Sequence, residues 1–243
     1  MKPTQIPLRV RLRDSSVFAS YFAGRNQPAV DALVALAPGV PPTCVWLHGP
    51  HASGKTHLLQ AACVQWSARG ETTAYVPLRE LGGDAEALTG YGELALVAVD
   101  DAELVAGNSA AERALFRLHQ ELDERGGHLV VSGASPPAAL DFKLRDLASR
   151  LKGGIVLTLH TLDDNEQMQA LQRRAQLRGF ELPEETVQYL QRRMPRDMAS
   201  LSAFLDQLDE ASLIAQRKLT VPFVREVLRG HSSSSSVPKQ SED

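Results

Sequence analysis

Eight residues from Gly49 to Thr56, with the sequence GPHASGKT, have the types and spacing of a phosphate-binding loop. An apolar run at 44–47 precedes them, and an apolar stretch that favours a helix follows from Leu58. Glycines at both ends let the backbone turn several N–H groups toward one phosphate, and the helix start adds its positive end. The lysine can reach the β- and γ-phosphates, and the threonine hydroxyl can hold Mg²⁺. The stretch predicts a site for ADP or ATP formed by Gly49, Pro50, His51, Ala52, Ser53, Gly54, Lys55, Thr56 and His57.

Two acidic residues, Asp100 and Asp101, follow the apolar run at 94–99. Continuous apolarity is typical of a strand covered on both faces of a parallel sheet, and ligands bind at the carboxyl ends of such strands. We expect Asp100 to complete the Mg²⁺ environment with Thr56, directly or through water. We expect Asp101 to stand where a base could orient the attacking water. A solvated turn is the alternative interpretation of the same two acids.

Strand and helix patterns alternate as far as residue 160, which predicts an α/β fold with a parallel sheet. Beyond that point only helical patterns occur. The predicted strands are 44–47, 73–76, 94–99, 128–132 and 155–159, and the predicted helices of this part are 29–36, 58–69, 110–125 and 144–151. The later helices are predicted at 163–178, 183–194, 197–216 and 220–230. We therefore expect an α/β domain at 14–162, a small all-helical domain at 163–230 and a disordered serine-rich tail at 231–243.

Residues 1–13 form a separate segment with no helix cap. Pro7 removes a backbone donor and favours an extended conformation. The amide of Gln5 and the apolar side chains of Ile6, Leu8 and Val10 suit insertion into a groove on a partner protein. A disordered terminus or an edge strand is the alternative.

Three aromatic residues, Phe18, Tyr21 and Phe22, lie ahead of the loop. They could shape a pocket for the nucleotide base, or they could be ordinary core residues. The two cysteines, Cys44 and Cys63, lack a CxxC partner and are interpreted as small core residues.

The composition is that of an ordinary globular protein, with 43% hydrophobic and 23% charged residues among 243. No run approaches the ~20 apolar residues of a membrane span, and no secretory core follows the first residues. We expect a cytoplasmic protein without a membrane partner. The net charge of −3 argues mildly against non-specific DNA binding as its main activity.

Four stretches carry a resemblance to a known family: QIPLRVRL at 5–12, LRDLASRL at 144–151, LRGFELPEE at 177–185 and LDQLDEASLIAQRKLTVPFVREVL at 205–228. Through them the chain resembles the DnaA-related AAA+ proteins of bacterial replication initiation, from Gln5 to about Leu228. The resemblance implies a P-loop AAA+ domain with a five-stranded parallel sheet, helices on both faces and a helical lid. It also makes Gly49–Thr56 the Walker A motif and Asp100–Asp101 the Walker B motif.

The resemblance assigns two further elements. QIPLRV is similar to the hexapeptide with which bacterial proteins dock on the β sliding clamp, with Gln5 and Leu8 as anchors. Arg150 matches the family's arginine finger, a cation supplied to the γ-phosphate of a neighbouring molecule. A surface arginine near a helix end is the alternative for Arg150.

The sequence departs from the family at two positions that sense the nucleotide. The acidic sensor 1 residue falls on Ala134, with only Ser135 as a nearby polar side chain, and the sensor 2 arginine falls on Ala199. Arg196, one helical turn earlier, could reach the nucleotide instead. We therefore expect weak or no intrinsic ATPase, with the nucleotide acting as a ligand that fixes conformation.

The resemblance predicts a regulatory adaptor. Held on the β sliding clamp on DNA, it would promote hydrolysis of ATP bound to the initiator DnaA through Arg150 and so prevent re-initiation of replication. An autonomous AAA+ ATPase of helicase-loader or DNA-remodelling type is the alternative, and a small-molecule P-loop kinase is a poorer one. No helix-turn-helix domain for sequence-specific DNA binding is expected, and self-association that hides Arg150 remains open.

Overall fold

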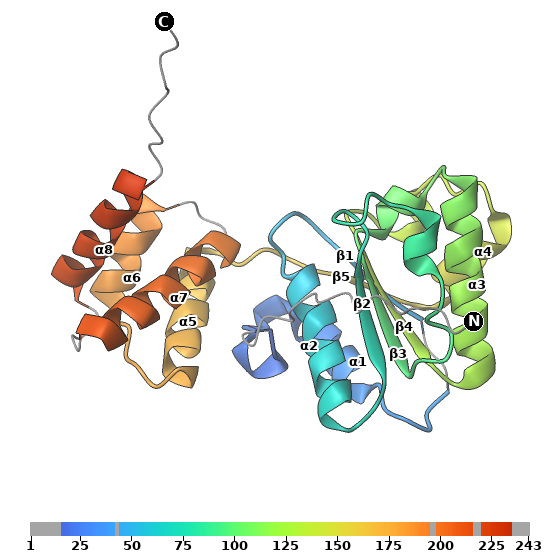
Figure 1. The fold of residues 1–243 in the computed structure, drawn as a ribbon, viewed down its shortest axis with the longest axis horizontal. Coiled ribbons are helices and arrows are strands. Elements are labelled where there is room, and N and C mark those ends of the chain that lie inside the picture. The colour runs from blue at the N-terminus through green and yellow to red at the C-terminus, as the bar shows by residue number, and fades with distance from the viewer. Residues whose placement is uncertain (1–15, 42–43, 195–197, 216–219, 235–243) are drawn as a thin grey trace, which may run out of the picture. The chain divides into compact units, whose positions relative to one another are not determined.

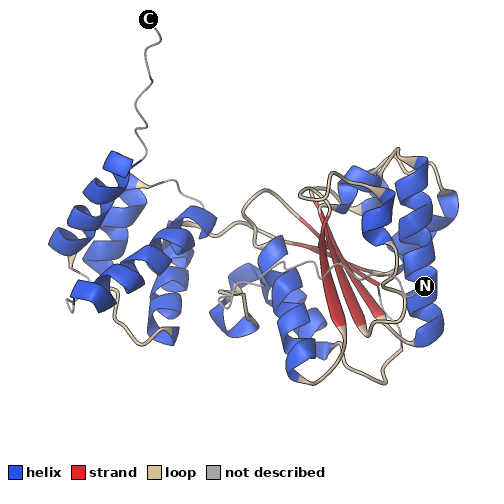
Figure 2. Cartoon of the chain, viewed as in Figure 1, coloured by secondary structure: helices blue, strands red, loops and turns tan. Residues whose placement is uncertain are grey.

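The structure, a computed structural model, describes residues 16–41, 44–194, 198–215 and 220–234 (Figure 1). The chain divides into two compact units, Met1–Thr161 and Leu162–Asp243. The first is built of strands and helices, and the described part of the second is built of helices and loops (Figure 2).

The first unit contains a five-stranded sheet in which every pair of neighbours is parallel, in the order β2-β3-β4-β1-β5. The predicted parallel α/β fold is therefore confirmed. The strands are β1 (Cys44–His48), β2 (Thr73–Pro77), β3 (Leu96–Asp100), β4 (His128–Gly133) and β5 (Ile155–Thr158). The helices of this unit are α1 (Gln27–Ala35), α2 (Lys55–Ala68), α3 (Ser109–Arg125) and α4 (Arg145–Gly153). Short 3-10 helices are η1 (Phe18–Ser20), η2 (Gly24–Asn26), η3 (Ala85–Leu88), η4 (Ala102–Val105) and η5 (Pro137–Ala139).

The sheet is covered on both faces because successive strand residues point to opposite sides. On one face Val45 and Ala98 pack with buried residues of α1 and α2, and on the other Trp46 and Val97 pack with those of α3 and α4. Two separate apolar clusters result. The near-continuous apolarity of the central strands follows from this double burial.

The boundaries of two elements differ usefully from the predictions. Strand β3 begins at Leu96 and ends at Asp100, so the first acid belongs to the strand, paired in register with Pro77. Helix α3 begins where the side chain of Asn108 accepts hydrogen bonds from the backbone of Ala110 and Ala111. It ends at a left-handed glycine cap, Gly126, as the sequence indicates.

The second unit consists of α5 (Asp164–Leu177), α6 (Glu184–Arg193), α7 (Met198–Ala215) and α8 (Val221–Ser234) around one apolar core. Asp163 and Glu166 form a reciprocal capping box that starts α5. Helix α8 continues past Gly230, where we expected it to end, and takes in the first serines of the expected tail. A glycine inside a helix costs only about 1 kcal/mol, so it does not by itself stop the helix.

The helices in the described ranges include none with the length and apolarity needed to cross a bilayer.

Candidate functional site

The candidate site lies at the carboxyl ends of β1, β3 and β4. In the sheet β4 lies between β3 and β1, although β1 and β3 are separated in sequence by α2 and β2. In register, the last residue of β1, His48, stands beside Gly133 of β4, and Val99 of β3 stands beside Val131. Loops that follow these strands therefore converge on one place, which is where ligands bind in open parallel sheets.

The loop after β1 has the backbone of a phosphate cradle. Gly54 is left-handed, with φ of 91°, and is the N-cap of α2. Ala52 also has a positive φ, of 62°, which is uncommon for a residue with a side chain. A side chain on Gly49 would collide with the backbone oxygen of Leu159. The loop can thus take this path only with small residues at these points, and it delivers the N-terminus of α2 to the site.

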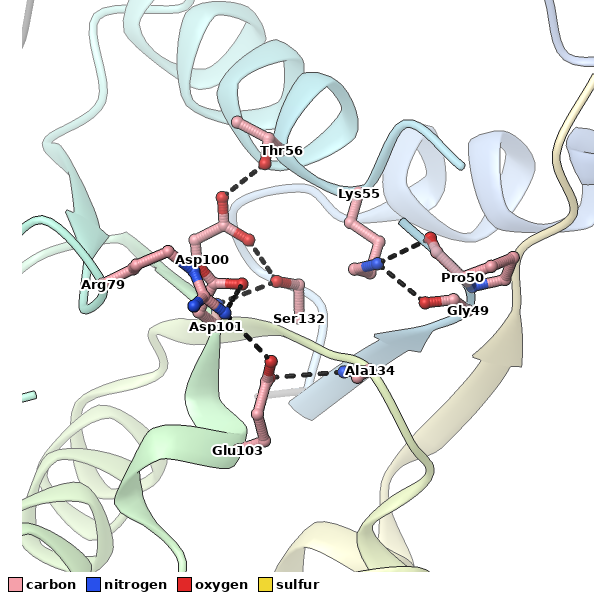
Figure 3. Close-up of polar contacts among 10 residues, drawn as sticks. All are labelled: Gly49, Pro50, Lys55, Thr56, Arg79, Asp100, Asp101, Glu103, Ser132 and Ala134. Atoms are coloured by element: carbon pink, nitrogen blue, oxygen red, sulfur yellow. Dashed lines mark hydrogen bonds and ion pairs between the residues drawn. The ribbon is translucent and has the colours of Figure 1, made fainter. Parts of the chain in front are cut away.

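Lys55 sits over this loop. Its Nζ donates hydrogen bonds to the backbone oxygens of Gly49, at 2.7 Å, and Pro50, at 3.0 Å (Figure 3). Burial lowers the pKa of Lys55, and the charges of Asp100 and nearby carboxylates oppose that shift. A phosphate in the loop would offer this half-buried ammonium a stronger, charged partner than two carbonyls.

Asp100 is the centre of a hydroxyl cluster. It is 4% exposed. One oxygen accepts hydrogen bonds from the Thr56 hydroxyl at 2.6 Å and the Tyr75 hydroxyl at 2.8 Å, and the other accepts from Ser132. Burial and then the charge of Asp100 raise the pKa of Tyr75, so the phenol stays protonated and donates.

The adjacent oxygens of Thr56 and Asp100 fit a Mg²⁺ ion, which prefers hard oxygen ligands. Within the described ranges, His, Cys, Asp and Glu side chains form no group of three that could hold a metal ion. Mg²⁺ would therefore be held by these two residues together with water and the nucleotide's phosphates, as is usual for this ion. Its chemistry there would be to neutralise phosphate charge.

Asp101 differs from its expected environment. Its backbone is left-handed, with φ of 58°, and its N–H donates to the Ser132 hydroxyl at 3.1 Å. Both carboxylate oxygens accept hydrogen bonds from Arg79, at 2.9 and 3.3 Å. The side chain that we expected to orient a water molecule is thus ion-paired in this structure.

Tyr21 closes the loop from the other side. Its ring covers Gly54, where a Cβ would lie 2.6 Å from Tyr21 Cε2, and its hydroxyl donates to the Ser53 carbonyl at 3.2 Å. Burial raises the pKa of Tyr21 to about 12. The amide of Asn26 donates to the Tyr21 hydroxyl at 3.0 Å and to the His160 carbonyl at 2.9 Å, and accepts from the His160 N–H at 2.8 Å. Tyr21 is therefore both a core residue and part of the wall around the loop.

Comparisons with known proteins agree with this geometry. Residues 164–228 match the family of the Hda lid domain. The chain is similar to the crystal structure of domain III of the replication initiation protein DnaA from Thermotoga maritima, with 20% identity and a TM-score of 0.69, over 89% of this chain and 97% of that one. The chain therefore has the α/β AAA+ fold, resembling DnaA domain III, and its helical lid matches that of Hda.

Two further structures share the fold. The replication initiator DnaA bound to AMPPCP and single-stranded DNA is 19% identical, with a TM-score of 0.63, over 92% of this chain and 70% of that one. The RuvB Holliday junction branch migration motor of Thermotoga maritima is 18% identical, with a TM-score of 0.58, over 84% and 69%. At these identities the likeness establishes the fold alone.

The two positions expected to sense the nucleotide, 134 and 199, are both alanine. At the sensor 1 position, the backbone N–H of Ala134 donates to Glu103 at 3.3 Å. Ala199, the position of the sensor 2 arginine, lies in the first turn of α7. Arg196 lies outside the described residues, as do the four residues of the proposed clamp-binding segment, Gln5, Ile6, Leu8 and Val10.

Arg150 lies in the last turn of α4. Its guanidinium is 3.8 Å from the Asp123 carboxylate and 5.3 Å from the centre of the Phe116 ring, and its side chain is 39% exposed. Glu112, fully buried at the start of α3, accepts hydrogen bonds from the backbone N–H groups of Lys143 and Leu144 at the entrance to α4. The helix that carries Arg150 is therefore anchored to α3.

Sequence reasoning missed five residues that shape the site: Tyr75, Arg79, Glu103, Glu112 and Ser132. Ser132 had a signal, since it is a polar residue at the end of an apolar run. Tyr75, Arg79 and Glu103 had none, because their partners are set by the order of strands in the sheet. Glu112 had none either, because two of its partners lie at the entrance to α4, far along the chain.

Proposed function

We propose that the protein is a regulator of the Hda type, which inactivates the replication initiator DnaA by promoting hydrolysis of DnaA-bound ATP. The observation that carries the proposal is the match of the lid to Hda on a first unit that resembles DnaA domain III. Proteins of one AAA+ branch bring a nucleotide and an arginine together at subunit contacts, and Arg150 would be the arginine that this chain supplies to DnaA.

The surroundings of Arg150 support this use. An ion pair at 3.8 Å between side chains that are 39% and 52% exposed contributes at most about 1 kcal/mol. The contact with the Phe116 face is of similar size, about 0.5–1 kcal/mol. Both interactions are weak compared with a charge-assisted hydrogen bond to a triphosphate. The Arg150 guanidinium can therefore leave them for a partner's nucleotide at little cost in free energy. Glu112 meanwhile holds the helix itself in place.

The protein's own nucleotide, ADP or ATP with Mg²⁺, would act as a structural ligand. Lys55, Thr56 and Asp100 would bind it, and the contact of Lys55 with the loop and of Thr56 with Asp100 supports this, while the sensor 1 position has only the Ala134 backbone to offer. Residues Gln5 to Val10 would hold the protein on the β sliding clamp, which brings it to DnaA at DNA.

A reconstitution tests the proposal. ATP-loaded DnaA, the clamp on DNA and this protein are mixed, and conversion of DnaA-bound ATP to ADP is followed. Arg150→Ala should abolish the stimulation while clamp binding persists. Lys152→Ala, an exposed basic residue on the same helical turn, should keep it.

Deletion of residues 1–13 should abolish the stimulation on loaded clamp. Full stimulation by Arg150→Ala would contradict the arginine assignment. Substantial ATP turnover by the protein alone, lost in Lys55→Ala, would instead favour an autonomous AAA+ ATPase, to which the shared fold with the RuvB motor gives some support.

A further inference from the structure

The phenol of Tyr75 reaches Asp100 from the neighbouring strand. Tyr75 of β2 stands in register with Ala98 of β3, and Asp100 lies two residues further along β3. Residues two apart on a strand point to the same face, so Tyr75 and Asp100 are diagonal neighbours on one face of the sheet. The aromatic side chain spans that diagonal, and its hydroxyl donates to Asp100 Oδ2 at 2.8 Å.

The position of the Tyr75 hydroxyl is fixed by the packing of its ring. The ring lies against the buried apolar cluster between the sheet and helices α1 and α2. Because burial and the charge of Asp100 both raise the pKa of Tyr75, the phenol keeps its proton. Tyr75 is therefore a neutral and well-placed donor to a carboxylate that is itself almost fully buried.

The acceptor capacity of Asp100 is largely used up. An ionised carboxylate offers about four acceptor sites on its two oxygens. Oδ2 accepts from the hydroxyls of Thr56, at 2.6 Å, and Tyr75, and Oδ1 accepts from the hydroxyl of Ser132 (Figure 3). In the part of the chain that the structure describes, these three hydroxyls are the donors to the Asp100 side chain. One acceptor site is left, and it is on Oδ1.

Mg²⁺ and Ca²⁺ make different demands on such a carboxylate. Mg²⁺ is octahedral, keeps several waters and needs few protein oxygens beside the phosphates of a nucleotide. The Thr56 hydroxyl and a water held by the remaining site of Asp100 meet this need. Ca²⁺ takes about six to eight oxygens and readily binds both oxygens of one carboxylate. To do so here it would have to displace the Tyr75 phenol from Oδ2.

We infer that Tyr75 is a specificity-determining residue, which occupies Oδ2 of Asp100 and so makes the site favour Mg²⁺ over Ca²⁺ when a nucleotide binds. The inference rests on the nucleotide and Mg²⁺ site proposed above and adds an ion preference to it. The hydrogen bond that Ca²⁺ must displace is charge-assisted and therefore strong. Asp100 is only 4% exposed, so little water is at hand to replace it.

The test is equilibrium titration of the isolated full-length protein with ATP, with MgCl₂ or CaCl₂ as the sole divalent salt. The quantity compared is the dissociation constant of ATP in Ca²⁺ divided by that in Mg²⁺. Tyr75→Phe keeps the ring and removes the hydroxyl, so this ratio should fall at least about fivefold through tighter binding in Ca²⁺, while affinity in Mg²⁺ stays within about twofold. Tyr91→Phe is the matched control, since its ring packs on the opposite face of the sheet, and it should equal the wild type in both salts.

An unchanged ratio in Tyr75→Phe would overturn the inference, because the phenol would then not stand in the way of Ca²⁺. A lower ratio that came from weaker binding in Mg²⁺ would overturn it too, as would equal weakening in both salts, which is what a disturbed loop would produce. Failure of the wild type to bind ATP in Mg²⁺ would overturn it together with the nucleotide site. Neither DnaA nor clamp is present, so the role of Arg150 is tested separately by the reconstitution. Tryptophan fluorescence of each variant checks that the first unit keeps its fold.

Discussion

Replacing the buried Glu112 by alanine should destabilise the first unit and loosen the helix that carries Arg150. The carboxylate accepts three backbone hydrogen bonds: from Gly107 at 2.8 Å, Lys143 at 3.1 Å and Leu144 at 2.7 Å. Gly107 and Lys143 are exposed residues, so water can replace the lost acceptor there, whereas Leu144 is half-buried. An unsatisfied buried donor costs about 1–3 kcal/mol, and exchanging a charged acceptor for water costs about 0.5 kcal/mol each. We expect a total loss of about 2–4 kcal/mol.

Urea unfolding followed by tryptophan fluorescence is a suitable assay. The chain has two tryptophans, Trp46 and Trp66, and both are buried in the first unit, so the signal reports on that unit alone. With a slope of about 2 kcal/mol per molar urea, the midpoint should fall by about 1–2 M. Glu112→Gln keeps the shape and one acceptor oxygen and should lose about half as much.

Glu124→Ala is the matched control, because this exposed residue on the same helix makes a single side-chain hydrogen bond, with Gln120. It should stay within about 0.5 kcal/mol of the wild type. If Glu112→Ala unfolded at the same midpoint and with the same slope as Glu124→Ala, the buried carboxylate would contribute nothing net, and the reasoning would be refuted.

Three further predictions concern the nucleotide site and pH. Gly54→Ala should weaken ATP binding at least about tenfold, because the new Cβ displaces Tyr21 from the loop. Gly70 is also left-handed but has open space around it, so Gly70→Ala should retain ATP affinity, and equilibrium titration of ATP measures both variants. Thr56→Ala should remove most of the dependence of nucleotide affinity on Mg²⁺, and an unchanged dependence would place the ion elsewhere. Burial lowers the pKa of His128 below its usual 6.5, so the unfolded chain binds more protons and stability should fall as the pH falls through 6.5. His128→Gln should reduce the slope of the urea midpoint against pH in that range, and an equal slope would contradict this origin.

The part of the site that could be predicted is formed by residues that are close together in the sequence. Gly49 to Thr56 fold as strand, loop and helix within one short stretch, and an apolar strand ending in Asp100 identifies its own buried carboxyl end. Fold class followed in the same way, from strands that alternate with helices.

The remainder depends on which strands are neighbours. Because β2 and β4 flank β3, Tyr75 and Ser132 reach Asp100, and Arg79 reaches Asp101. Nothing in the spacing of these residues along the chain indicates that order. The same limit explains why Asp101 was expected to orient water, because the sequence shows Asp101 but does not show that the sheet brings Arg79 next to it.

One buried amide joins the covering of the phosphate loop to the last residues of the first unit. The side chain of Asn26 holds the hydroxyl of Tyr21 on one side and both backbone groups of His160 on the other, and the neighbouring Arg25 donates to the Thr161 carbonyl. The chain leaves the first unit directly after that residue. Moving the loop's cover alone would break the buried hydrogen bond between Asn26 and Tyr21, and moving the exit alone would break the two partly buried bonds between Asn26 and His160, so one amide links the cover to the last residues of the first unit.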